Sequence, residues 1–385
     1  MKGVNTTKST HRVAVLGALA VTAIGLMRDG GYYSPDLLVI AGLLVAAVVA
    51  DWTPISRSDR RVALALTAFA AGWLIRGATA ETTARAVSLS AAAVAFGAAY
   101  LLARRCREPG ERVLATRLLI FTAVGVALLS LVLWAADVEP WGLAFDGVWR
   151  LAGPFSYPNA AGLFFALASI LNLARNERSW AERVICGATL GAALLATASR
   201  GGMLALGVGL VVLGRRQLHA QTPVREAVKS LATGAIAVGV LYVGLLTAGV
   251  VGGSAGSGSA SIDDRVAEWS AAARQGGDNL LFGSGPELDL HIHNFRGDAI
   301  ARFAHNEVLQ VFAGLGVVGV ALLAAVVVAL VAAMRDSDGP RGRVAVASLA
   351  VFAVGGLIDF SWHFVGLTAF AGWLAGLDED DPSTE

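Results

Sequence analysis

The chain has 385 residues, of which 56% are hydrophobic and only 15% are charged, and its mean hydropathy is +0.64. A water-soluble domain of this length could not bury so much apolar surface, so the composition indicates a membrane protein with many spans. The net charge is +1, and the sequence has no basic patch with interleaved aromatic residues, which argues against a nucleic-acid partner.

Apolar segments that are long enough, or nearly long enough, to cross a bilayer recur along the whole chain. A membrane-spanning helix needs about 20 residues. The first segment has the composition of a signal peptide, but the many spans after it favour an uncleaved helix. The sequence therefore predicts an all-α, polytopic membrane protein of about twelve transmembrane helices, at 13–27, 36–51, 62–77, 86–103, 118–135, 159–174, 184–198, 201–214, 230–251, 314–334, 344–358 and 361–377.

The basic residues indicate how these spans are oriented, because Lys and Arg collect in short cytoplasmic loops. With the N-terminus in the cytoplasm, 21 of the 30 Lys and Arg residues fall in loops on that side. The pattern predicts a multi-pass protein with both termini in the cytoplasm. Cys106 and Cys186 lie in or near segments on that side, so we expect no structural disulfide between them.

Two regions on the opposite side are long enough to hold structure of their own. The first, at about 137–158, contains aromatic residues suited to the headgroup level of a bilayer. The second is a large extracytoplasmic loop, which we place at 252–313, between nine spans in 1–251 and three spans in 314–385. Its composition predicts a Gly/Ser-rich flexible linker at 252–260, a helix starting near Asp263 and a turn at 283–286. The acidic tail at 378–381 is interpreted as a solvated end.

The stretch His305-Asn306-Glu307 runs directly into a long apolar segment, which places an imidazole at a membrane surface. An ionisable group at such a border is a candidate functional site, with a polar helix start as the alternative. Arg200 occupies a hairpin with almost no loop. Its guanidinium therefore either snorkels to the headgroups or binds an anion that a lipid carries. The two glycines that follow would let a substrate or another backbone approach.

Arg265 precedes Trp269 by four residues, a spacing that places both on one face of a helix. The cation either stacks on the indole or is an exposed loop arginine. Asp289, His291 and His293 alternate and would share one face of an extended segment. A divalent ion there would lack a fourth ligand, so a solvent-facing strand is the favoured interpretation.

Three further polar residues lie at the expected outer ends of spans. Asp359 and His363 are near the start of the last span, where they could line the same outer cavity. Asn159 begins the sixth span and is interpreted as a helix cap. The sequence contains no Walker phosphate loop, dinucleotide fingerprint or zinc-protease helix, so it indicates no cofactor and no metal site.

Separated pieces of the chain together resemble the O-antigen ligase and polymerase family. His305-Asn306, nine residues, Gly316, two residues and Gly319 is similar to that family's histidine signature. The hairpin around Arg200 is similar to its arginine hairpin, and Arg265 with Trp269 resembles the start of its large outer loop, as does 281–285. The segments 154–159 and 359–360 fit as well. The resemblance runs from about Gly153 to the end of the chain, and the N-terminal third agrees only in topology.

The resemblance implies a metal-independent glycosyltransferase of the GT-C type in the cytoplasmic (inner) membrane. Such an enzyme moves a glycan from a polyprenyl diphosphate carrier to a hydroxyl of a glycan or glycolipid acceptor at the outer face. His305 would be the base, because an imidazole is suited to accept a proton at neutral pH. Arg200 and Arg265 would bind the diphosphate, since guanidinium groups match phosphate oxygens. Asn159, Asn306, Asp359 and His363 would line the cavity.

Other functions fit part of the sequence. A polysaccharide polymerase of the same family would use the same residues and differ in its acceptor. A flippase or transporter for a lipid-linked sugar would also need outer arginines, but it should show an internal repeat or broken helices in matching halves, and neither is clear in the sequence. A non-catalytic scaffold would leave His305 and Arg200 unexplained.

Overall fold

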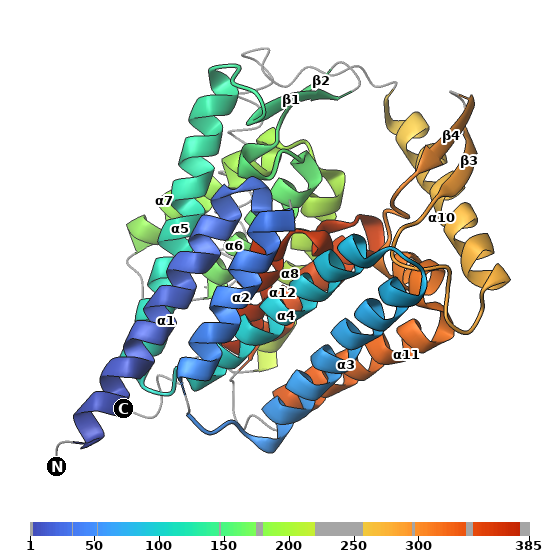
Figure 1. Cartoon of the computed structure of the whole chain (residues 1–385). Helices are drawn as coiled ribbons and strands as arrows, with labels where there is room; N and C mark the ends of the chain where they lie inside the picture. Colours follow the sequence, from blue (N-terminus) through green and yellow to red (C-terminus); the bar gives the residue numbers. More distant parts are fainter. Residues whose placement is uncertain are drawn as a thin grey trace.

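The computed structural model describes residues 3–32, 34–51, 53–145, 148–174, 180–219, 257–294, 297–335 and 342–377. Within these ranges the chain forms twelve α-helices and two small β-hairpins (Figure 1). The helices are α1 (Gly3–Met27), α2 (Ser34–Ala50), α3 (Arg57–Thr79), α4 (Thr83–Arg105), α5 (Pro109–Ala135), α6 (Pro158–Ala174), α7 (Trp180–Ala196), α8 (Arg200–His219), α10 (Ser257–Asp278), α11 (Glu307–Arg335), α12 (Arg343–Ile358) and α13 (Val365–Gly376).

Five of the described helices are long and apolar enough to cross a membrane: α1 over Thr10–Met27, α3, α4, α5 and α11. Shorter apolar helical stretches of 10–17 residues lie in α2, α6, α8, α12 and α13. All the expected spans coincide with helices except the one at 230–251, which lies outside the described residues together with the acidic tail at 378–381. The structure thus confirms a helical membrane protein, and the number of crossings stays a prediction.

Side-chain contacts distinguish the two ends of the bundle. At one end, which we call the site end, α11 begins and α12 finishes, and the Asn306 amide donates to the Leu357 carbonyl over 2.8 Å. At the other end, the His11 imidazole of α1 lies 3.2 Å from the Glu111 carboxylate of α5. Both cysteines are buried and free.

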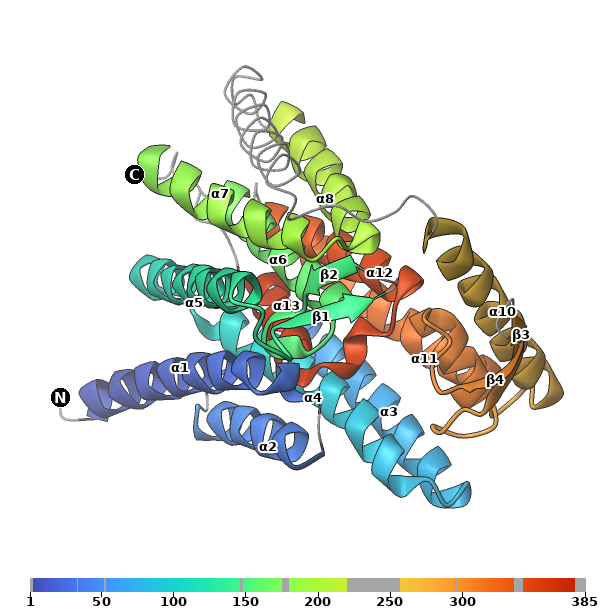
Figure 2. The ribbon, with the colours of Figure 1, turned by 90° about the horizontal axis from the view of Figure 1, so that it is seen from above.

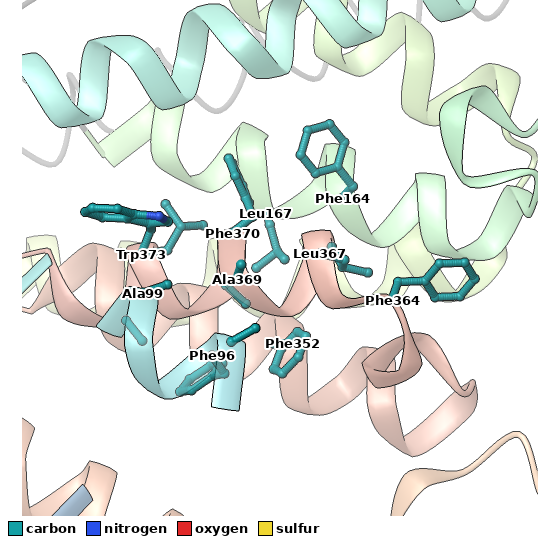
Figure 3. Close-up of a cluster of buried hydrophobic side chains, with 14 of the residues drawn as sticks. Phe96, Ala99, Phe164, Leu167, Phe352, Phe364, Leu367, Ala369, Phe370 and Trp373 are labelled. Atoms are coloured by element: carbon teal, nitrogen blue, oxygen red, sulfur yellow. The ribbon is translucent and has the colours of Figure 1, made fainter. Parts of the chain in front are cut away.

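The shortest helix, α13, lies at the centre of the bundle. It has 12 residues, all of them buried. A helix that is apolar all round must be covered on every side, and Figure 3 shows how this is done: Phe96 and Ala99 of α4, Phe164 and Leu167 of α6 and Phe352 of α12 surround Leu367, Phe370 and Trp373. This packing fixes the ends of α4, α6, α12 and α13 relative to one another, and these ends carry part of the candidate site.

The large loop folds into a unit of its own on one side of the bundle, next to α11 (Figures 1 and 2). It consists of α10 and the antiparallel hairpin β3 (Leu290–Asn294) and β4 (Gly297–Ala301). A small apolar cluster that includes Ala272, Leu290 and Ala313 joins this unit to α11. The helix begins at Ser257, earlier than the predicted start near Asp263, so part of the expected linker is helical. Residues 252–256 lie outside the described residues.

The other hairpin, β1 (Gly142–Phe145) and β2 (Val148–Leu151), lies in the first of the two long loops. These hairpins make the protein slightly less than all-α, as far as the described residues show. On β3, His291 and His293 are exposed, and the His293 Nδ1 lies 2.9 Å from a carboxylate oxygen of Asp298. The interpretation of this segment as a solvent-facing strand is therefore confirmed.

The helix α11 begins at Glu307 rather than at 314 and is broken at Gly316, whose φ of 65° and ψ of −157° are accessible essentially only to glycine. The stretch 280–285 fills the break. Ser284 N–H donates to the Ala313 carbonyl over 2.8 Å, and Val317 N–H donates to the Leu280 carbonyl over 2.8 Å. The backbone groups that the helix loses are thereby satisfied, as they must be in an apolar span. The glycine of the histidine signature is thus needed for the junction between α11 and the loop unit.

Candidate active site

His305 lies at the junction between the loop unit and α11. Its backbone is left-handed, with a φ of 46°, a conformation that non-glycine residues seldom adopt and that is often found at functional sites. Asn306 caps α11, because its side-chain oxygen accepts the Leu309 N–H over 3.0 Å. The cap fixes the direction in which the chain enters the helix, and it holds the preceding imidazole above the helix end. The predicted polar helix start is therefore confirmed, and it also positions the candidate base.

The imidazole of His305 contacts a buried carboxylate that the sequence did not single out. Nδ1 lies 2.7 Å from Oε2 of Glu268, on α10. Burial raises the pKa of Glu268 to about 7, Asp264 and Asp359 add to the shift, and Arg265 opposes it. When Glu268 is ionised, its carboxylate accepts a hydrogen bond from the Nδ1–H of His305, which leaves the lone pair of Nε2 as the acceptor. A carboxylate that orients an imidazole in this way is a common arrangement for a general base.

Arg265 lies in the same cluster. Its Nη2 is 3.5 Å from Oδ2 of Asp359, and its Nη1 is 3.8 Å from Oε2 of Glu268. The side chain is 21% exposed, so the interpretation as an exposed loop arginine is wrong. Burial lowers the pKa of Arg265, but the nearby Asp359 carboxylate outweighs it, and the net shift is upward. Nη1 is buried and donates no hydrogen bond within the described part of the chain.

Asp359 is the centre of a hydrogen-bond network that joins three segments. The Tyr157 hydroxyl and the Asn159 amide donate to its carboxylate over 2.9 and 2.6 Å, and the Phe360 N–H donates over 2.8 Å. The expectation that Asn159 caps the sixth span is wrong, because α6 begins one residue earlier and the Asn159 amide binds Asp359. The Asn159 oxygen accepts from Arg150 over 2.9 Å.

Arg200 is exposed at the first position of α8. Its guanidinium makes no hydrogen bond to a described residue, so the structure does not join it to Arg265 directly. The hairpin that carries it is nevertheless tied to the site, because Arg150 Nε donates to the Thr197 carbonyl over 2.8 Å. The following glycines serve helix packing: a Cβ at Gly202 would lie 2.8 Å from the Gly162 backbone.

His363 is buried, and its ring packs against the rings of Phe303 and Phe360. Arg85 Nη2 donates to its Nδ1 over 3.2 Å, and its Nε2 lies 3.5 Å from Oε2 of Glu307. Since arginine can only donate, Nδ1 must hold the lone pair, and the Nε2 proton faces Glu307. The rings of Phe303 and Phe360 are stacked with their centroids 4.1 Å apart. The edge of Phe360 also meets the His305 ring, at 5.0 Å.

No group of three or more His, Cys, Asp or Glu side chains suited to a metal ion occurs among the described residues. Asp289, which sequence analysis considered as a ligand, lies 3.3 Å from Arg302 instead. The site thus consists of an imidazole, carboxylates, guanidinium groups and amides. Such groups can move protons and bind anions.

Sequence reasoning missed Arg85, Arg150 and Glu268, and it assigned no partner to Tyr157 or Glu307. Glu268 follows Arg265 by three residues, and this helical spacing was the one local signal for it. Arg85 and Glu307 have partners that are far away along the chain, and the contacts of Arg150 and Tyr157 with Asn159 follow no helical or strand spacing.

The fold and the site together define a helical membrane protein with a polar, titratable site at one end of its helices. Residues 185–324 match the family model described as O-antigen ligase. This matched region contains the motifs around Arg200, Arg265 and His305, and it supports the assignment to the O-antigen ligase and polymerase family that those motifs led us to expect. No curated protein matches the chain.

Proposed function

We propose that the protein transfers a glycan from a polyprenyl diphosphate carrier to a hydroxyl of a glycan or glycolipid acceptor, as a ligase of the O-antigen ligase type. The family match supports this class of reaction. The observation that carries the proposal is the 2.7 Å contact between His305 and Glu268. It gives the protein a base with a defined free nitrogen at the point where the membrane bundle meets the loop unit.

In the proposed reaction, the acceptor hydroxyl gives its proton to Nε2 of His305, and its oxygen attacks the anomeric carbon of the donor. The bond between that carbon and the phosphate oxygen breaks, and its electron pair goes to the diphosphate. The products are a new glycosidic bond, a protonated imidazole and a free polyprenyl diphosphate. Glu268 stabilises the imidazolium as it forms.

The leaving diphosphate gains negative charge as the bond breaks, so fixed cations on it would stabilise the transition state. Arg200 is exposed on the hairpin that Arg150 ties to the site, and it is available for such a contact. Arg265 is held by Asp359, and its Nη1, which makes no hydrogen bond to a described residue, leaves a donor for a phosphate oxygen. In this proposal Asn159 and Asp359 act through Arg265, whose position they fix, and Asn306 acts through His305. His363 packs against the stacked rings of Phe303 and Phe360 and holds them in place beside His305.

The site end would face the outside of the cytoplasmic membrane. The loop unit with α10 lies at this end, and the charge pattern favours an outside location for 252–313. The opposite end carries Arg104 and Arg105, in the last turn of α4, as expected for a cytoplasmic end.

The test is transfer by purified protein in lipid nanodiscs, with a polyprenyl diphosphate-linked oligosaccharide as donor and a glycolipid as acceptor. His305→Gln should lose about 10²–10⁴-fold in rate, the usual contribution of a general base. His293→Gln is the matched control, because this histidine is exposed on β3. Normal transfer by well-folded His305→Gln protein would end the proposal.

A polymerase of the same family would use the same site on a growing chain. The acceptor preference separates the two activities, because a polymerase adds repeats to its own product, whereas a ligase attaches one glycan to a different acceptor. A ladder of products from the donor alone would therefore favour the polymerase.

A flippase is the second candidate function, because α11 is broken at Gly316 and transporters often contain broken helices. In this chain the stretch 280–285 fills the break with backbone hydrogen bonds, which favours a fixed junction. Transbilayer movement of a lipid-linked sugar in liposomes that contain the purified protein, without any transfer, would support the flippase.

A further inference from the structure

Three large apolar side chains are exposed directly after the end of α10: Leu280, Leu281 and Phe282 are 53%, 61% and 62% exposed. We call these three residues the apolar tip. Asp278 and Asn279, which precede the tip, are exposed and polar. Figure 1 shows α10 running from the level of β1 and β2 down to the beginning of α11, so the helix brings the tip to the bundle. Exposed apolar patches of this kind mark membrane or protein interaction sites.

The depth of the tip follows from its position on α11. The Val317 N–H donates to the Leu280 carbonyl over 2.8 Å, and the Val318 N–H donates to the Leu281 carbonyl over 3.2 Å. Every side chain of α11 from Val311 to Met334 is apolar. At about 1.5 Å per residue this run is roughly 36 Å long, compared with about 30 Å for the hydrocarbon of a bilayer. When α11 spans the membrane, Val317 and Val318 therefore lie within the hydrocarbon.

The side chains next to the tip are exposed to the same surroundings. On α11, Val317 and Val318 are exposed. On α3, Ile75 is exposed, and it precedes Arg76, which contacts the tip. Both helices are long and apolar enough to cross a membrane, so these side chains face lipid in the bilayer. The tip continues this apolar surface, and we therefore expect lipid rather than water to cover it.

The backbone of the tip has the hydrogen bonds that an apolar environment requires. Water can satisfy a carbonyl of an exposed loop, but in hydrocarbon each carbonyl must find its partner within the protein. The Leu280 and Leu281 carbonyls accept the two N–H groups of α11. The Phe282 carbonyl accepts Nε of Arg76 over 3.1 Å, and the Gly283 carbonyl accepts Nη2 of Arg76 over 2.9 Å. Every carbonyl from Leu280 to Gly283 is therefore satisfied.

Arg76 indicates the level of the lipid headgroups. It lies in the last turn of α3, and its Nη1 donates to the Thr79 hydroxyl over 3.0 Å. An arginine near the end of a span keeps its guanidinium at the interface while its stem lies along apolar surface. The Gly285 N–H donates to the Gly314 carbonyl over 3.0 Å, so the chain descends along α11 from 285 to 281. The tip thus reaches below the guanidinium into the leaflet.

We propose that the apolar tip is a membrane anchor of the loop unit. It enters the leaflet on the side of the site end, where acyl chains cover it, and Arg76 ties it to α3 at headgroup level. The helix that ends at the tip, α10, carries Arg265 and Glu268. The anchor therefore holds these two side chains at a fixed height above the membrane. It requires a membrane but no glycan transfer, so it stands or falls independently of the proposed function.

The test measures the surroundings of a nitroxide label in protein reconstituted into nanodiscs of phosphatidylcholine and phosphatidylglycerol. Cys106 and Cys186 are replaced by serine. Phe282→Cys is compared with Ile300→Cys, the matched control, because Ile300 is exposed to a similar degree on β4 of the same unit. The ratio of collisions with oxygen to collisions with a water-soluble nickel complex should be several-fold higher at 282 than at 300. Equal ratios, or a label at 282 that neither reagent reaches because a second copy of the chain covers it, would overturn the proposal.

A second measurement uses the protein without substitution. A phosphatidylcholine with a photoreactive group near the glycerol end of one acyl chain should crosslink to the peptide that contains the tip, and not to β3 or β4. Arg76→Gln removes the donors to Phe282 and Gly283 and should reduce this labelling several-fold. Arg274→Gln is the control, because Arg274 is exposed on α10. Labelling of the hairpin instead of the tip, or labelling that Arg76→Gln leaves unchanged, would refute the anchor.

Discussion

Oε2 of Glu268 lies 2.7 Å from Nδ1 of His305, although 37 positions separate the two residues. The contact joins α10 of the loop unit to the beginning of α11. Because the pKa of Glu268 is raised to about 7, the charge of this pair changes in the physiological pH range. The first two predictions depend on that property.

We expect the transfer rate to rise with pH through about 7, the pKa of Glu268. Above that value the carboxylate is ionised and holds the Nδ1 proton of His305, so Nε2 is free to accept a proton. Glu268→Gln should lower the rate at least about tenfold at pH 8 and should shift or abolish this rise. The measurement is a pH profile of kcat for both proteins. An unchanged profile in Glu268→Gln would show that Glu268 does not orient the base.

The same pKa shift should appear in stability. Between pH 4.5 and about 7, folded Glu268 keeps a proton that the unfolded chain has released, since burial raises its folded pKa. Its contribution is therefore fully present below pH 4.5 and is lost as the pH rises through about 7, and it amounts to at most about 3 kcal/mol.

Glu268→Gln does not titrate, so it should unfold at a higher temperature than the unmodified protein at pH 8. At pH 4.5 the difference should shrink. Thermal unfolding of both detergent-solubilised proteins across this range measures the difference. A constant difference at all pH values would contradict the assigned shift.

Arg200→Lys and Arg265→Lys should each reduce turnover roughly tenfold or more, because lysine keeps the charge and loses the two-pronged donor geometry of arginine. Arg200 is exposed, so its substitution should leave thermal stability unchanged. Arg265 is buried against Asp359, so its substitution should lower stability too.

If the two arginines bind one diphosphate, the double variant should lose much less than the product of the single losses. Fully additive effects in the purified system would show that they do not act on a common phosphate group.

Gly316→Ala should destabilise the protein by more than about 2 kcal/mol. The backbone at Gly316 is left-handed, and an added Cβ would lie 2.5 Å from the Leu280 carbonyl oxygen. Gly125→Ala is the control, because a Cβ there meets open space on α5 and alanine favours a helix. Melting temperatures compare the two variants. Equal stability would mean that the junction between α11 and 280–285 tolerates a side chain.

The orientation of the bundle predicts which residues an impermeant thiol reagent can reach. Ile300 is 56% exposed on β4, and Gly110, at the start of α5, is exposed at the opposite end. In a background with Cys106 and Cys186 replaced by serine, Ile300→Cys should react in intact cells, and Gly110→Cys should react only after permeabilisation. The reverse labelling pattern would show that the predicted orientation in the membrane is wrong.

The sequence by itself determined the class of the protein and the residues that begin its site. Apolar composition and segment length indicate a helical membrane protein, because backbone groups in hydrocarbon must bond within their own segment. The spacing of His305, Asn306 and Gly316 indicates the family, because each has a local role: the candidate base, the helix cap and the break in α11.

Only the tertiary structure decided how these residues are connected. Glu268 meets His305, and Asp359 meets Arg265, Tyr157 and Asn159, through helices that are distant in sequence. Such contacts follow from the packing of α6, α10, α11 and α12 and leave no periodic pattern in any one segment. The interpretation of Asn159 as a cap and of Arg265 as an exposed side chain failed for this reason. Local chemistry specified what each side chain could do, and long-range packing selected its partner.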